Sequence, residues 1–213
     1  MTQTTNIAEF RDSALAKSNS RLNVHDPLKG LTVEELQALS LTDRLPWHTL
    51  ALNVTGDLNV GTMVRTSHCL GATSVIVFGR QRIDNRSLVG AGNYIKFEKI
   101  SGCDENLLLN FDKFSEIMSD RNLTPIFVEG GGINLPDIDW KICVEAINLR
   151  GSQPCLVMGN ETDGIPQDFL DRVHEFPNSF VVSIPMLGVI RSLNVAVAHA
   201  IVSSDMCMRM DWM

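Results

Sequence analysis

The chain has 213 residues, of which 44% are apolar and 20% are charged, a balance that is typical of a folded globular protein and excludes a disordered or fibrous one. No apolar run approaches the roughly 20 residues of a membrane-spanning helix, and the first residues contain no signal-peptide-like segment, so we expect a cytoplasmic protein with no membrane partner. The net charge of −7 argues against a nucleic-acid partner unless basic residues gather locally.

The predicted elements divide the chain into an N-terminal extension, residues 1–45, and one α/β domain, residues 46–213. In the extension, Thr32 and Glu35 have the spacing of a capping box and predict a short helix within 32–44. After residue 45, apolar runs with β-branched residues alternate with helical patterns, which predicts a mostly parallel sheet with helices on both faces. Strands are predicted at 49–54, 74–78, 125–128, 154–158 and 180–184, and helices at 59–71, 104–121, 166–174 and 191–210.

The first segment that suggests chemistry is "NVGTMVRTSHCLGA", residues 59–72. Asn59 is predicted to cap the helix, and Gly61 permits the close approach of another backbone or a ligand. The helix N-terminus together with Arg65 would also suit an anion such as a phosphate. Taken alone, the segment is better explained as an ordinary capped helix whose arginine faces water.

The second segment is "LVMGNETDGIP", residues 156–166. A buried strand is predicted to end at Gly159, and a polar loop leads to Pro166, the predicted first residue of a helix. Ligands of open parallel sheets bind at the carboxyl ends of strands, where this loop lies. Ordinary turn chemistry explains the same residues equally well.

The third segment is "IPMLGVIRSLNVAVAHAIV", residues 184–202, in which a strand is followed by a loop around Gly188 and an apolar helix. Ser192 and Asn194 are predicted at the buried start of this helix, where polar groups must bond backbone or a ligand. His199 is expected to be a hydrogen-bonded core residue. A helix that is apolar on nearly every side indicates burial in the core or in a subunit interface.

Together the three segments closely resemble the signature motifs of the SpoU (TrmH-like) RNA ribose 2′-O-methyltransferases of the SPOUT class. They read N-x-G-x-x-x-R-T, G-N-E-x-x-G-I and I-P-M-x-G-x-x-x-S-L-N-V, and the resemblance covers roughly residues 48 to 210. Two positions depart from the usual pattern, Gly56 and Thr162, and neither is a polar residue that defines a motif. The resemblance implies a SPOUT fold with a deep C-terminal trefoil knot, S-adenosyl-L-methionine as cofactor, and methylation of a ribose 2′-hydroxyl in tRNA or rRNA, with tRNA favoured.

The resemblance also assigns residues by position. It implies a cofactor pocket lined by Val128, Gly159, Ile184, Met186 and Leu193, and a catalytic polar set of Asn59, Arg65, Glu161, Ser192 and Asn194. An arginine keeps its proton at neutral pH, so we expect Arg65 to hold the acceptor phosphate and polarise the hydroxyl rather than act as the family's suspected base. Glu161 is expected to brace the loop or an asparagine. Asn59 and Arg65 would then share the RNA-facing rim of the pocket.

RNA binding by an acidic protein requires a local basic surface. Arg80, Arg82 and Arg86 fall within one short loop and, with Arg65, Lys96, Lys99 and Arg191, are predicted to form it. Three solvated loop arginines are an equally good interpretation. The run Gly130–Gly132 lacks the spacing of a dinucleotide loop and is predicted to be a turn near the cofactor.

A homodimer is predicted on the C-terminal helix. This segment carries more apolar residues than one side of a single domain needs, namely Val195, Val197, Ile201, Val202, Met206 and Met210. No metal is expected: the five cysteines are widely spaced without a C-x-x-C pair, as in reduced thiols that fill a core.

Two alternatives stay open. A SPOUT enzyme could methylate a base nitrogen, although the pair Asn59 and Arg65 goes with ribose methylation. An RNA-binding or assembly factor could keep the fold without activity, although Arg65, Glu161 and Asn194 are all present.

Overall fold

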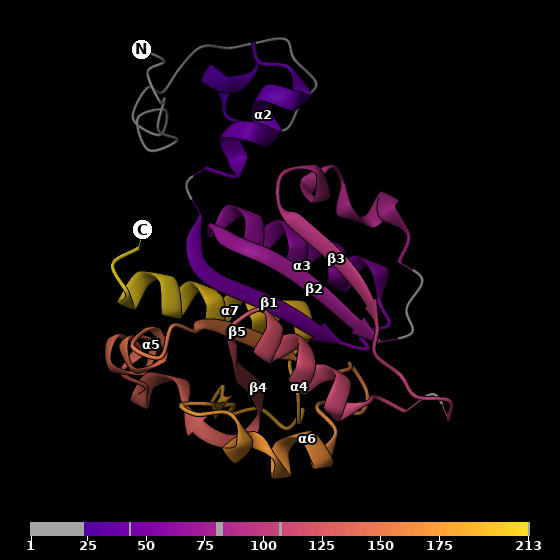
Figure 1. The fold of residues 1–213 in the computed structure, drawn as a ribbon, viewed down its shortest axis with the longest axis vertical. Helices are drawn as coiled ribbons and strands as arrows, with labels where there is room; N and C mark the ends of the chain where they lie inside the picture. Colours follow the sequence, from indigo (N-terminus) through magenta and orange to yellow (C-terminus); the bar gives the residue numbers. More distant parts are fainter. Residues whose placement is uncertain (1–23, 43, 80–82, 107, 213) are drawn as a thin grey trace.

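A β-sheet forms the centre of the fold, and the helices pack around it (Figure 1). A computed structural model describes residues 24–42, 44–79, 83–106 and 108–212. Within these residues a six-stranded sheet has the order β3-β2-β1-β5-β4-β6, and every pairing is parallel, so the predicted α/β fold is confirmed. The strands are β1 (Leu45–Leu52), β2 (Ala72–Gly79), β3 (Lys96–Ser101), β4 (Leu123–Asn134), β5 (Gln153–Met158) and β6 (Phe180–Ser183).

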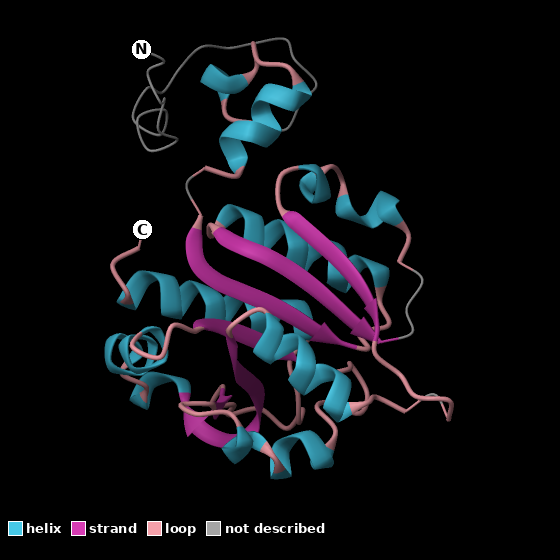
Figure 2. Cartoon of the chain, viewed as in Figure 1, coloured by secondary structure: helices cyan, strands magenta, loops and turns pink. Residues whose placement is uncertain are grey.

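Helices cover both faces of this sheet, as the alternating pattern predicted (Figure 2). The α-helices are α2 (Val33–Ser40), α3 (Asp57–Cys69), α4 (Phe111–Asp120), α5 (Trp140–Asn148), α6 (Gln167–Asp171) and α7 (Val195–Arg209). Short 3₁₀ helices are η1 (Asp26–Leu28), η2 (Asn85–Leu88), η3 (Ala91–Asn93), η4 (Leu135–Asp137) and η5 (Val173–Glu175). The capping box that begins α2 is confirmed, because Glu35 N–H donates to Thr32 Oγ1 and Thr32 N–H donates to the Glu35 carboxylate.

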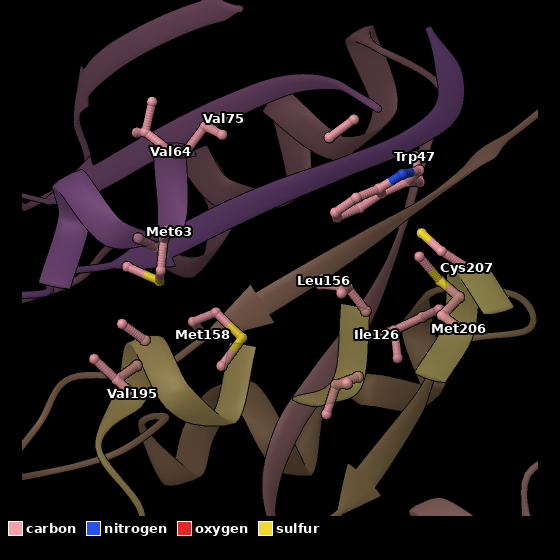
Figure 3. Close-up of a cluster of buried hydrophobic side chains, with 14 of the residues drawn as sticks. Trp47, Met63, Val64, Val75, Ile126, Leu156, Met158, Val195, Met206 and Cys207 are labelled. Atoms are coloured by element: carbon pink, nitrogen blue, oxygen red, sulfur yellow. The ribbon is translucent and has the colours of Figure 1, made fainter. Parts of the chain in front are cut away.

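The hydrophobic core has two layers, one on each face of the sheet. On one face, α3, α5 and α7 pack on residues such as Trp47, Leu156 and Met158 (Figure 3). On the other face, α4 and α6 pack on a second cluster that is rich in phenylalanine. Strands buried on both faces read as continuous apolar runs, which is why β1, β2 and β5 were predictable.

Two elements were missed. The edge strand β3 is mostly polar in sequence and only partly buried, so it lacks the apolar run that marks the inner strands. Helix α5 follows Asp139, whose side chain accepts a hydrogen bond from Ile142 N–H, and this N-cap signal was overlooked.

Several predictions of local structure were wrong. Helix α4 starts at Phe111 rather than 104, because Asn110 caps it and residues 103 and 109 form an isolated bridge instead. Gly130–Gly132 are not a turn but part of β4, whose pairing with β6 shifts register between Val128 and Ile133. Pro166 is the N-cap of α6 rather than its first helical residue.

The C-terminal helix α7 belongs largely to the core of its own chain. Val195, Val202 and Met206 are buried, so the prediction that they contribute to a dimer face was wrong, and Met210 packs partly on the core. Val197 stays exposed, as do Ile201 and Met208. The apolar excess that the sequence shows is therefore split between the core and one exposed face.

His199 on α7 is a hydrogen-bonded core residue, as predicted. Its Nε2 lies 2.9 Å from Thr49 Oγ1 on β1 and 3.3 Å from Ser67 Oγ on α3. These two hydroxyls are themselves 2.9 Å apart, so one buried polar cluster ties α3 and α7 to the same strand. Complete burial lowers the pKa of His199 to about 4.

We expect stability to fall as the pH drops from 6.5 to 4. Over this range the unfolded chain takes up a proton at His199 while the folded chain does not, so the free energy of unfolding decreases, by roughly 3 kcal/mol for a shift of this size. His48 and His68, whose pKa values burial also lowers, act with the same sign. Urea unfolding of the wild type and of His199→Gln between pH 4.5 and 7.5 measures the effect. The variant should be less stable at pH 7 and show a shallower slope, and an unchanged slope would contradict the assignment.

The prediction that the cysteines fill the core is only partly confirmed. Cys155 and Cys207 are buried, but Cys103 and Cys143 are half-buried and Cys69 is exposed, and all five are free thiols. Among the described residues no group of three or more His, Cys, Asp or Glu side chains is placed to hold a metal ion. No helix in the described part of the chain is long and apolar enough to cross a membrane.

Candidate active site

Three loops meet at the carboxyl ends of β1, β5 and β6. Residues 53–56 join β1 to α3, residues 159–166 join β5 to α6, and residues 184–194 lead from the end of β6 to α7. Since β1 pairs with β5 and β4 pairs with both β5 and β6, these ends lie along one edge of the sheet. This is the edge where open parallel sheets bind their ligands.

The Glu161 carboxylate holds the start of α3. Its Oε2 accepts hydrogen bonds from Thr55 N–H at 2.9 Å and from the Thr55 hydroxyl at 3.0 Å. Its Oε1 accepts from Gly56 N–H at 2.8 Å and from Asn59 Nδ2 at 2.7 Å. Gly56 is the N-cap of α3 and has no side chain, so a carboxylate from a loop distant in sequence satisfies the free N–H groups there.

These contacts decide the protonation state of Glu161. Partial burial raises its pKa, but the hydrogen bonds from Thr55, Asn59 and Gly56 outweigh burial and lower the pKa of Glu161 to about 2. The carboxylate is therefore ionised at neutral pH, and its acceptor positions are occupied. This agrees with the prediction that Glu161 braces the structure rather than acting as a base.

Asn59 forms hydrogen bonds to both the second and the third motif. Its Nδ2 donates to Glu161, and its Oδ1 accepts from Asn194 Nδ2 at 3.0 Å. Asn194 in turn caps α7, because its Oδ1 accepts from Ala196 N–H at 2.9 Å and Val197 N–H at 3.2 Å. We call Glu161, Asn59 and Asn194 the polar relay; it joins one residue of each motif and links the N-termini of α3 and α7.

The structure changes some of the predictions made for the starts of α3 and α7. Asn59 lies in the first turn of α3 and is not its N-cap. A Cβ at Gly61 would lie 2.1 Å from Ser87 O, so this glycine is needed for the close approach of η2, one of the two possibilities predicted. Ser192 and Asn194 are exposed rather than buried at the start of α7.

All five predicted cofactor residues line one cavity of about 320 Å³. They are Val128, Gly159, Ile184, Met186 and Leu193. Two members of the predicted catalytic set, Glu161 and Ser192, line the same cavity. A Cβ at Gly159 would lie 2.4 Å from the Gly164 carbonyl carbon, so the loop can fold back on itself only with glycine at that position. The volume is within the usual range of small-molecule sites.

Arg65 is not among the residues that line this cavity. Its side chain is exposed further along α3, and no hydrogen bond or ion pair ties it to another part of the described chain. Asn59 and Asn194 instead line an apolar groove between α3 and α7, with Leu58, Val197 and Ile201. The rim that Asn59 and Arg65 were predicted to share is thus not formed within a single chain.

The predicted basic surface receives little support. Arg80 and Arg82 lie outside the described residues. Arg86 is exposed, but its guanidinium is paired with the Asp84 carboxylate, which raises the pKa of Arg86. Lys96 pairs with Glu98, and Lys99 donates to Ile83 O and Asn85. Arg191 lines the cavity.

Two polar residues at the site were missed. Asn160 donates from Nδ2 to Asn53 O at 2.7 Å, and its Oδ1 accepts from Thr162 N–H and Asp163 N–H. It therefore ties the second loop to the end of β1 while forming the turn that its sequence indicated. Glu129, at the end of the regular part of β4, accepts from Ile165 N–H at 2.9 Å. Its place after a buried strand was the signal that could have identified it.

The fold and the site define an α/β protein with a small-molecule cavity at the carboxyl ends of parallel strands. The chain belongs to the SpoU rRNA methylase family, because the profile of that family matches residues 48–204. The motif resemblance is thereby confirmed. A comparison with curated proteins gives no match.

Solved structures share this fold. The TrmH/SpoU tRNA modifying enzyme of A. aeolicus is 20% identical, covers 84% of this chain and 83% of its own, and gives a TM-score of 0.62. An AdoMet-bound rRNA methyltransferase from Sinorhizobium meliloti is 20% identical, with coverages of 82% and 60% and a TM-score of 0.61. AviRb from Streptomyces viridochromogenes, in complex with AdoMet, is 21% identical, with coverages of 78% and 58% and a TM-score of 0.59. The chain thus spans about three fifths of the last two. The implied trefoil knot is not decided by strand order and stays a prediction.

Proposed function

We propose that this protein is an S-adenosylmethionine-dependent methyltransferase that modifies a ribose 2′-hydroxyl in RNA, with tRNA the favoured substrate. The observation that carries the proposal is the polar relay, in which Glu161, Asn59 and Asn194 join the three motifs directly beside the cavity. An assembly factor without activity would need the relay for stability but would have no need for the cavity that all five assigned cofactor residues line. Membership of the SpoU family supports RNA as the substrate class.

The cavity suits S-adenosylmethionine on its own geometry. Its wall combines apolar side chains such as Val128, Ile184 and Leu193 with the backbone of the Gly159 loop, as expected for an adenosine-containing ligand. When bound, the cofactor supplies an activated methyl group on a sulfonium. The chain's own residues must align the acceptor oxygen, exclude water and accept its proton or pass it to solvent.

Four of the five polar residues then have separate tasks. Glu161 and Asn194 hold the starts of α3 and α7, and Asn59 fixes their relative position. Arg65 provides a guanidinium fork for the acceptor phosphate and polarises the hydroxyl. Because Glu161 is already ionised and fully bonded, the proton does not go to it.

Cofactor binding is expected to need no metal. The cavity offers apolar walls and backbone groups, and the described residues contain no cluster of metal-binding side chains. Titration calorimetry of the purified protein with S-adenosylmethionine, with and without a chelator, tests this. Equal affinities are expected, and binding that the chelator abolishes would refute a metal-free site.

A second copy of the chain is proposed to cover the groove between α3 and α7. Apolar side chains are exposed there, among them Leu58 at 78%, Val197 at 48% and Met208 at 63%. Arg65 follows Leu58 and Thr62 along the exposed side of α3, so a two-fold contact at the groove would bring it toward the partner's cavity. This arrangement would complete the rim that one chain lacks.

A charge in this groove should break the dimer. Light scattering of the wild type should give twice the chain mass of 23.6 kDa. Ile201→Glu should give monomer or insoluble protein and lose activity, because the buried carboxylate would have no partner. The matched control is Ile142→Glu, at an exposed apolar position on α5 outside the groove, which should keep the doubled mass. A fully active monomer would overturn the proposed assembly.

A further inference from the structure

Glu129 is an acidic residue of the cavity wall that none of the three motifs contains. It follows Val128 at the point where β4 loses its regular pairing with β6. Its Oε2 accepts from Ile165 N–H, and its Oε1 accepts from Gly130 N–H, each at 2.9 Å. Two backbone bonds thus hold the carboxylate in place, while a carboxylate can accept about four.

The loop of the second motif is shaped to admit this carboxylate. Gly164 has φ +68°, and a Cβ there would lie 2.4 Å from Glu129 Oε2. Glycine at this position therefore allows the side chain to reach Ile165 N–H. The same loop begins at Gly159 and presents Glu161 to α3, so Glu129 and Glu161 hold it at its two ends.

Among the acidic residues that line the cavity, Glu129 is the one placed to accept a positive group of the ligand. Glu161 has its oxygens occupied by the residues that precede α3, and Asp163 is exposed at the rim. Arg191 is the basic residue among the described residues that line the cavity. Beside Glu129 the wall is apolar, with Val128, Met158 and Val182, and such walls strengthen the field of a nearby charge.

We propose that Glu129 is a specificity residue that recognises the positive sulfonium, so that the cavity prefers the methyl donor to its neutral thioether product. The inference rests on the proposed function. The donor and the product share their adenosine, ammonium and carboxylate groups and differ in the methyl group and in the charge on sulfur. With the sulfur placed near Glu129, the carboxylate would separate the two ligands, and loss of the charge on methyl transfer would favour release of the product.

The test compares affinities of the full-length protein for S-adenosylmethionine and S-adenosylhomocysteine by titration calorimetry. Glu129→Gln removes the charge but keeps an oxygen for Ile165 N–H, and thermal unfolding verifies that the variant folds. It should bind S-adenosylmethionine roughly tenfold more weakly and S-adenosylhomocysteine almost unchanged. Asp163→Asn, which removes one charge from the rim of the same cavity, should leave the ratio of the two affinities unchanged.

Equal weakening of both ligands by Glu129→Gln would overturn the proposal, because the carboxylate would then act on a shared group or on the loop alone. No weakening of either ligand, or a change of ratio in Asp163→Asn instead, would overturn it as well. Failure of the proposed function is distinguishable from these results. If the protein does not use this cofactor, the wild type itself would bind neither ligand. If only the RNA assignment is wrong, both affinities would behave as predicted and the methylation assay alone would fail.

Discussion

Arg65→Ala is expected to lower RNA methylation on the order of 100- to 1,000-fold while the affinity for S-adenosylmethionine stays unchanged. The reason is the position of Arg65, which is exposed on α3 and does not line the cavity that contains the predicted cofactor residues. Its loss removes a group from the acceptor side and leaves the polar relay untouched. Single-turnover methylation and titration calorimetry measure the two effects separately.

Arg65→Lys is the matched variant for this prediction. Lysine keeps the positive charge but not the planar fork, so partial activity between that of wild type and alanine is expected. If Arg65→Ala lost cofactor binding, Arg65 would belong to the cofactor side. If it kept full activity, neither the motif assignment nor the proposed dimer geometry would hold.

Glu161→Ala is expected to cost both stability and activity. The substitution removes the acceptor of four hydrogen bonds at the start of α3, from Thr55 N–H and hydroxyl, Gly56 N–H and Asn59. We expect a loss of about 2 kcal/mol in the free energy of unfolding, with a melting temperature lower by about 4–8 °C. Misplacement of α3 relative to α7 should lower methylation on the order of 100-fold.

Glu161→Gln distinguishes the effect of the hydrogen bonds from the effect of the negative charge. It keeps one carbonyl acceptor but turns an amide toward two donors, so an intermediate loss of stability is expected. Asp163→Asn, in the same loop, should melt like the wild type. Since the pKa of Glu161 is about 2, the activity of the wild type should show no acid limb from this residue above pH 4. Normal stability of Glu161→Ala would show that the relay does not hold the two helices.

The inner strands and the polar motifs were predictable because each gives a pattern within a short stretch of sequence. Buried parallel strands are apolar on both faces, so β1, β2 and β5 stand out in the sequence. The edge strand β3 is only partly buried and gives no such signal. Residues assigned to the cofactor pocket by family resemblance, such as Gly159 and Leu193, do gather at one cavity.

Contacts between distant segments were not predictable. The sequence indicates a capped helix at Asn59, but the groups at the start of α3 are satisfied by Glu161, which lies 105 residues beyond Gly56. A local contact was overlooked as well, because Asp84 lies only two residues before Arg86 and pairs with its guanidinium. Burial of α7 was misjudged at Val202 and Met206, because an apolar pattern does not distinguish the core of one chain from an interface.

The position of the transferred methyl group tests the central claim most directly. Purified protein is incubated with methyl-labelled S-adenosylmethionine and total RNA, and the RNA is then split by nuclease and by alkali, with Arg65→Ala as the blank. The proposed function predicts label in an alkali-resistant dinucleotide, because a 2′-O-methylated ribose cannot be cleaved at that position. Label recovered on a nucleobase, or no transfer to RNA by a protein that binds the cofactor, would contradict it.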